Sequence, residues 1–152
     1  MIVDFIGRAV VVCMAYFIAV IAAAAFFVLV VFGTETIVQA QGEPLFAFVF
    51  RLTIAVGAVA TMAGAIAAPP ILAAIAVAEA FRLSGLAFHA AAGVALGALA
   101  LIAWDDEGRS GQPEYIVAMA SGAVGAFVYW LLAGRRAGLW RARLSRPAPP
   151  EA

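Results

Sequence analysis

The ionisable residues around the end of the second apolar run are the first candidates for chemistry. Glu79 and Arg82 lie near the end of that run, and His89, the one histidine of the chain, follows shortly after. A turn near Leu83–Ser84 would fold the next segment back, so that Glu79 and His89 approach each other. Because each charge would be costly alone in an apolar environment, we expect Glu79, Arg82 and His89 to form one cluster.

Three interpretations of this cluster are open. It could be a polar lock that fixes the hairpin, or a relay for a proton or a substrate, since an ionisable residue inside a membrane is a candidate functional site by default. It could also be a haem site at His89, although a haem held by two histidines would need the second one from a partner chain or a second copy. Arg51 is expected to extend its head to the interface; pairing with Glu43 or Asp105–Asp106, or recognition of an anion, are the alternatives.

Motifs for catalysis are absent from the sequence. There is no phosphate loop, no G-x-S-x-G, no HExxH and no pair of carboxylates within an apolar run. The single cysteine, Cys13, excludes a disulfide within one chain and any Cys/His metal spacing. We therefore predict no catalytic residue, no metal site, no resident cofactor, no nucleic-acid partner and no enzymatic activity.

The composition indicates which elements position these residues. Hydrophobic residues make up 66% of the 152 residues and charged residues 12%, whereas soluble domains average about 45–50% and about 25%. A membrane span needs about 20 apolar residues, and four segments qualify, at about residues 9–32, 46–81, 86–104 and 115–133. We predict an all-α, polytopic, four-transmembrane-helix bundle that forms one domain over residues 1–146, with a disordered tail at 147–152.

The second span and the turns around it carry further predictions. Residues 46–81 are too long for a straight span, since a hydrocarbon core is about 30 Å thick. Proline inside a helix removes a hydrogen bond and clashes with the preceding turn, so Pro69-Pro70 predicts a kink, with the part after it packed in the bundle. A short helix lying on the membrane surface is the alternative. We expect a polar loop over Gly33–Pro44 and a helix stop at Gly85.

Arginine placement predicts the orientation. Cytoplasmic segments are enriched in Lys and Arg, and with both termini inside, seven of the nine arginines are cytoplasmic while Arg51 and Arg109 are not. The arginine-rich segment Arg135–Arg146 follows the last span and is expected to contact anionic lipid headgroups. We therefore predict a multi-pass protein of a bacterial inner membrane with both termini in the cytoplasm.

Small residues recur at helical spacing within the predicted spans. Such residues let helices approach closely in lipid, so we assign helix packing to six glycines: Gly57, Gly64, Gly93, Gly97, Gly122 and Gly125. His89 shares a face with Gly93 and Gly97, and it is expected to point into the bundle. The resulting hypothesis is an accessory or structural subunit that packs with itself or with partner membrane proteins. The alternatives are a small solute or ion transporter or channel, and a haem- or quinone-associated anchor subunit.

Overall fold

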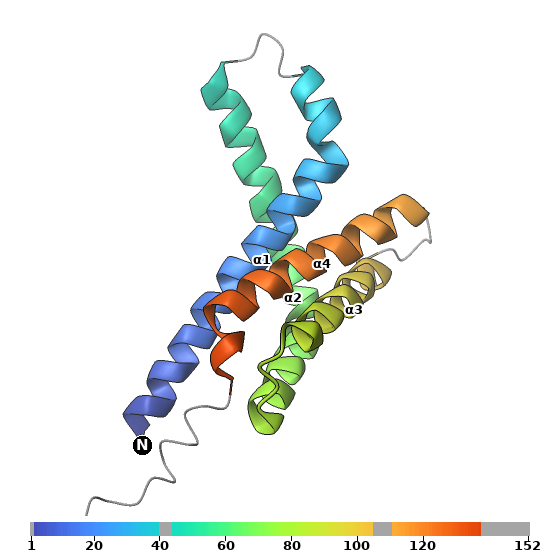
Figure 1. Ribbon diagram of the computed structural model, residues 1–152. Coiled ribbons are helices and arrows are strands. Elements are labelled where there is room, and N and C mark those ends of the chain that lie inside the picture. Colours follow the sequence, from blue (N-terminus) through green and yellow to red (C-terminus); the bar gives the residue numbers. More distant parts are fainter. Residues whose placement is uncertain (1, 40–43, 105–110, 138–152) are drawn as a thin grey trace, which may run out of the picture.

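The computed structural model describes residues 2–39, 44–104 and 111–137, and within them the chain is helical. Four long helices follow one another: α1 (Ile2–Gln39), α2 (Leu45–Phe81), α3 (Leu86–Trp104) and α4 (Gln112–Leu132), with a 3-10 turn, η1 (Gly134–Arg136), after α4. All four are long and apolar enough to cross a membrane. The predicted all-α, four-helix architecture is confirmed (Figure 1). The predicted disordered tail lies outside the described residues.

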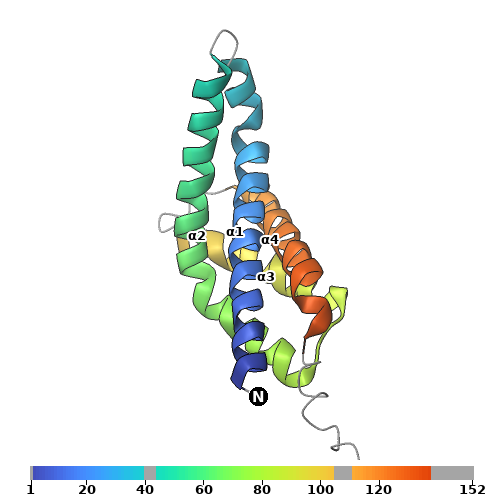
Figure 2. The ribbon, with the colours of Figure 1, turned by 90° about the vertical axis from the view of Figure 1, so that its left-hand side faces the viewer.

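Helices α1 and α2 form the longer part of the molecule. They extend together beyond α3 and α4 at the end where α1 finishes and α2 begins (Figures 1 and 2). Helix α1 continues to Gln39, past the residue at which the predicted polar loop was to begin, Gly33. The reason is local: neither proline nor glycine occurs between Thr34 and Gln39, and a helix that is already nucleated extends readily through polar residues.

Helix α2 passes through Pro69 and Pro70 as a single element of 37 residues. The part after the prolines packs against the bundle, because Ala78 is buried and Ile75 contacts the buried cluster formed by α1 and α4. The alternative of a separate short helix that starts at the prolines is therefore not what the structure shows. The part before the prolines is different, since no residue from Leu45 to Ala63 is buried.

Helix α4 lies between α3 and α1 and packs tightly against both. A Cβ placed on Gly93, Gly97 or Gly122 would come closer than 3.0 Å to backbone atoms of the facing helix, so α3 and α4 are in direct backbone contact. On its other side, a Cβ on Gly125 would lie 3.0 Å from the Ala19 carbonyl oxygen of α1. Helices associate in lipid through close packing of this kind, because lipid tails are as apolar as the helices and the hydrophobic effect does not drive them together.

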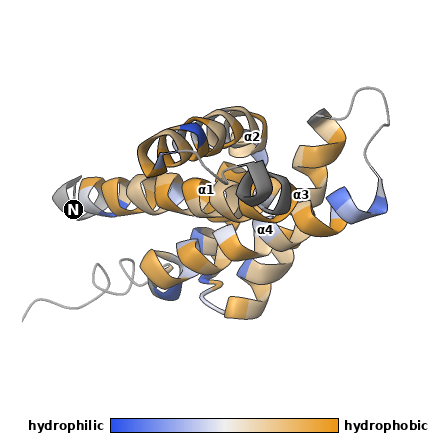
Figure 3. Ribbon diagram, turned by 90° about the horizontal axis from the view of Figure 1, so that it is seen from above, coloured by the Kyte–Doolittle hydropathy of each residue, from blue (hydrophilic) through white to orange (hydrophobic). Residues whose placement is uncertain are grey.

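The outward faces of the helices are hydrophobic. Large apolar side chains are exposed along the bundle. Figure 3 shows that hydrophobic residues occur along most of the length of the helices. Few large side chains are buried: the central cluster consists of Ala15, Ala19, Tyr129 and Ala133. An exposed apolar surface around a core of small residues is the pattern expected when the surroundings are lipid.

Candidate functional site

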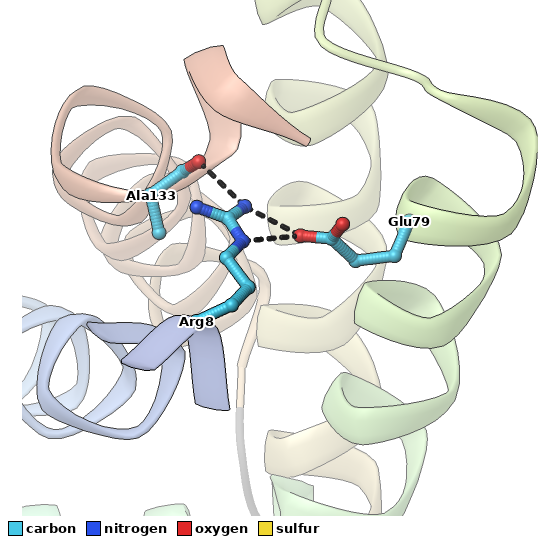
Figure 4. A network of polar contacts seen from close by, with 3 residues as sticks. All are labelled: Arg8, Glu79 and Ala133. Atoms are coloured by element: carbon cyan, nitrogen blue, oxygen red, sulfur yellow. Dashed lines mark hydrogen bonds and ion pairs between the residues drawn. The ribbon is translucent and has the colours of Figure 1, made fainter. Parts of the chain in front are cut away.

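Five polar residues, Arg8, Glu79, Arg82, His89 and Arg135, lie at one end of the bundle, where α1 starts, α2 turns into α3, and α4 passes into η1. We call this the turn end. Arg8 of α1 donates from Nε to Glu79 Oε1 at 2.9 Å, and its Nη2 contacts the same oxygen. The same Nη2 donates to the Ala133 carbonyl oxygen at 3.0 Å (Figure 4).

The Arg8–Glu79–Ala133 network joins three helices. Arg8 lies near the start of α1, Glu79 in the last turn of α2, and Ala133 at the C-cap of α4. The Ala133 carbonyl is one of the last oxygens of α4, which have no partner within the helix. A cation placed there also interacts favourably with the negative end of the helix dipole. The arginine is thus held by one carboxylate and one helix C-terminus, and both side chains are largely buried.

The structure gives Glu79 a different ion-pair partner from the predicted one. The expected cluster joined Glu79 to Arg82 and His89, but the ion pair forms with Arg8, which the sequence indicated only as one of the cytoplasmic arginines. Arg82 instead ends α2 as its C-cap, with a left-handed backbone (φ 56°) and an exposed side chain. The helix stop is at Arg82, not at Gly85, because the chain must already turn there for α3 to begin at Leu86.

His89 is buried, in agreement with its predicted position beside Gly93 and Gly97. Its Nδ1 lies 3.0 Å from the Gly85 carbonyl oxygen, and since a carbonyl only accepts, Nδ1 carries the hydrogen. The ring stacks on Tyr129 with centroids 5.9 Å apart. The other nitrogen, Nε2, is buried, has no hydrogen-bond partner and faces η1: a Cβ on Gly134 would lie 2.8 Å from it.

This geometry bears on the haem interpretation. Nε2 is the nitrogen left to ligate iron; it is buried, and Gly134 packs over the ring face next to it. No group of three or more His, Cys, Asp or Glu side chains that could hold a metal ion occurs among the described residues. The haem interpretation of His89 stays a prediction, and it needs a second histidine from another chain.

A cavity of about 370 Å³ runs between the four helices. Its walls extend from Val59 to Ala78 on α2 and from Phe88 to Leu101 on α3, with Tyr129 at the turn end. Two of its polar side chains are bonded to backbone: the Tyr16 hydroxyl donates to Gly64 O at 2.9 Å and the Ser121 hydroxyl to Ala118 O at 2.8 Å. His89 also lines the cavity, and its Nε2 has no hydrogen-bond partner. Volumes of this size are typical of small-molecule sites, and these walls suit an apolar occupant.

The remaining predicted residues are spread over the structure. Arg51 is exposed in the first two turns of α2, far along the chain from the turn end, and it has an interaction partner there. Five of the six predicted packing glycines meet other helices within the chain, while a Cβ on Gly57 would meet nothing within 4 Å.

Comparison of the chain with known protein families, with curated proteins and with solved structures finds no match.

Proposed function

We propose that this chain is an accessory or structural subunit of a bacterial inner membrane that acts by packing α2 against another membrane helix, without enzymatic activity of its own. One observation carries the proposal. Gly57, Ala58, Thr61 and Ala65 of α2 are exposed, and at 3.6 residues per turn they fall within an arc of about 100°. We call this surface the Gly57 face.

The Gly57 face differs from the small-residue surfaces elsewhere in the chain. Gly93, Gly97 and Gly122 are each covered by a neighbouring helix, whereas the space beside Gly57 is open. The one hydroxyl on the face, that of Thr61, donates to the Gly57 carbonyl at 2.8 Å and is therefore satisfied within α2. A flat surface of small residues, whose one hydroxyl is already hydrogen-bonded within the same helix, favours close approach of a second helix.

Two further parts of the proposal concern the orientation of the chain in the membrane and a bend in α2. The arginine distribution favours both termini in the cytoplasm, which puts the turn end, with Arg8, Arg82 and Arg135, at the cytoplasmic face. Helix α2 is about 55 Å long at about 1.5 Å per residue, longer than a core of about 30 Å. We expect it to fit by bending at Pro69-Pro70, where the proline nitrogens cannot donate.

The transporter or channel alternative has less support. A hydrophilic solute or ion needs polar groups along its path, and the bonded hydroxyls of Tyr16 and Ser121 offer little to it. The Arg8–Glu79 pair could close the turn end of such a path, as an ion pair between helices can, but it lies beyond the apolar walls of the cavity.

Native mass spectrometry after mild extraction tests the proposal. We expect the chain to carry a second copy or a partner subunit at fixed stoichiometry. Gly57→Leu should release the isolated chain, because the leucine fits the chain's own fold but blocks the approaching helix. Ala95→Leu, which adds similar bulk to an exposed position of α3, is the control and should keep the assembly. A wild-type protein that is always a single chain would contradict the proposal; a homo-oligomer that Gly57→Leu leaves intact would favour a transporter or channel.

A further inference from the structure

At the turn end, Arg82 and Arg135 lie on either side of a hydrogen bond between a side chain of α4 and the α2–α3 turn. The Trp130 indole Nε1 of α4 donates to the Ser84 carbonyl oxygen in the α2–α3 turn at 2.8 Å. The Arg135 guanidinium lies over the Trp130 ring, 5.6 Å from its centroid, and Arg82 precedes Ser84 in the same turn. The Trp130–Ser84 hydrogen bond therefore brings Arg135, after the end of α4, toward the α2–α3 turn that carries Arg82. We call this the Arg82–Arg135 surface.

Both charges on this surface are available to a ligand. Arg82 and Arg135 are exposed, and within the described ranges neither forms an ion pair, since Glu79 is held by Arg8. Arg135 donates from Nε and Nη2 to the Leu131 carbonyl oxygen at 3.1 and 2.9 Å. A carbonyl orients the guanidinium and leaves its full positive charge uncompensated.

The backbone at Arg82 indicates that its side chain has a use. Its φ of 56° is the one positive value among non-glycine residues of the described structure. Glycine is the usual residue at such a helix end because a Cβ is strained there. Strained residues of this kind tend to occur where a side chain is needed for function.

The interhelical cavity reaches this surface. Ala78, one turn before Arg82, and Phe88, shortly after Ser84, both line it. Along α3 the lining from Phe88 to Leu101 spans about 20 Å, somewhat more than the depth of about 15 Å of half a hydrocarbon core. The cavity is thus long enough for one hydrocarbon chain that starts at the turn end and points toward the middle of the membrane.

From these two features we propose that the chain binds an anionic phospholipid, with its phosphate on Arg82 and Arg135 and one acyl chain in the cavity. Charge complementarity selects the head, because arginine holds phosphate oxygens through several N–H donors. The apolar walls select the tail, because most of the lining side chains are apolar and the hydroxyls of Tyr16 and Ser121 are already bonded. This site is separate from the Gly57 face and does not depend on it.

The head is tested in nanodiscs of equal parts phosphatidylglycerol and phosphatidylcholine. Released protein is weighed by native mass spectrometry, and the retained lipids are identified. Wild type should retain phosphatidylglycerol in preference to phosphatidylcholine, and Arg82→Gln with Arg135→Gln should lower that preference by about fivefold for each arginine removed. Arg82→Lys should keep most of it, and Arg51→Gln, at the other end of α2, should not change it. Equal retention of both lipids by wild type, or an unchanged preference in the double variant, would overturn the head assignment.

The tail is tested separately with Ala74→Phe, which places a large side chain in the cavity from α2. This variant should retain less of both lipids while the ratio between them stays near the wild-type value. The matched control is Ala73→Phe, its neighbour on an exposed face of α2, which should retain lipid normally. Thermal unfolding of each variant shows that it is folded. If Ala74→Phe is folded and retains as much lipid as wild type, the acyl chain does not occupy the cavity and the proposal is wrong.

Discussion

Arg8 and Glu79 are 71 positions apart in the sequence, and the ion pair between them fastens the start of α1 to the last turn of α2. The same guanidinium bonds the C-terminal carbonyl of α4 at Ala133. Three helices therefore meet at one side chain (Figure 4). Tyr129, on which the His89 ring stacks, is close enough to feel the charges of Arg8 and Glu79. The arrangement makes Arg8 the residue on which the turn end depends most.

Removing either partner of the pair should destabilise the fold. Hydrogen bonds to charged groups contribute about 1.5–3 kcal/mol, so we expect Glu79→Gln to lower the free energy of unfolding by about that amount, and Arg8→Gln by more, because it also leaves the Ala133 carbonyl without a donor. Unfolding by detergent titration measures both. In a double-mutant cycle the two losses should be strongly non-additive. Additive losses would show that the side chains do not act as a pair.

Replacing a packing glycine with alanine should change stability in opposite directions in α4 and in α2. Gly122→Ala should destabilise the chain by about 1–3 kcal/mol, because its methyl group would collide with the Gly93 carbonyl. Gly57→Ala adds the same methyl group where nothing lies within 4 Å. It should raise stability by about 0.5–1 kcal/mol, as alanine does in a helix interior. Thermal unfolding of the two variants in the same detergent compares them, and equal effects would contradict the close contact of α3 and α4.

The sequence predicts the helices well because the signal for each is local. An apolar run of about 20 residues has few other structures in a membrane, and the helical repeat alone puts Gly93 and Gly97 on one face of a helix. These features need no knowledge of the rest of the fold. The segment after Pro69-Pro70 could likewise be assigned to the bundle, since it lacks a polar face.

The polar site could be predicted only in part. Glu79 and His89 were identified as buried polar residues near one turn, but the partner of Glu79 comes from the far end of the sequence. Nothing local distinguishes Arg8 from the other arginines predicted to be cytoplasmic; only the packing of α1 against α2 and α4 does. The predicted end of the second span at residue 81 agrees with α2, but the residue that stops the helix is Arg82 and not Gly85.

His89 and Gly134 should behave as a size-dependent pair. Gly134→Ala would place its Cβ 2.8 Å from the His89 Nε2, so we expect a loss of about 1–3 kcal/mol from overpacking. His89→Ala should relieve that collision, so that the double variant is no less stable than His89→Ala alone. His89→Phe keeps the ring but loses the hydrogen bond to Gly85 and should cost about 0.5–1.5 kcal/mol. Thermal unfolding of the four proteins provides the comparison. A Gly134→Ala protein as stable as wild type would place η1 away from His89.

The orientation can be measured in cells. A reporter fused at Gly108, between the third and fourth spans, should be active as alkaline phosphatase and inactive as a cytoplasmic fluorescent protein, because the arginine distribution places both termini inside. A fusion after Ala137 should give the reverse pattern and is the control. Cytoplasmic activity at Gly108 would invert the orientation and move the Arg82–Arg135 surface to the outer leaflet.

Arg82 provides a test that separates stability from lipid binding. The left-handed backbone costs an ordinary residue about 1–2 kcal/mol, and the Arg82 φ of 56° lies in this region. Arg82→Gly should therefore raise the free energy of unfolding by about 1 kcal/mol, and Arg82→Asn, which tolerates this conformation, by less. Thermal unfolding in a zwitterionic detergent, which offers no anionic headgroup, measures the backbone effect alone. In the presence of phosphatidylglycerol, the difference in stability between Arg82→Gly and wild type should shrink or change sign, because the wild-type arginine then gains a phosphate partner that glycine lacks. If Arg82→Gly is stabilised over wild type by the same amount in zwitterionic detergent and in anionic lipid, the side chain of Arg82 has no ligand. If anionic lipid removes that stabilisation, the strained backbone at this helix end is retained for binding.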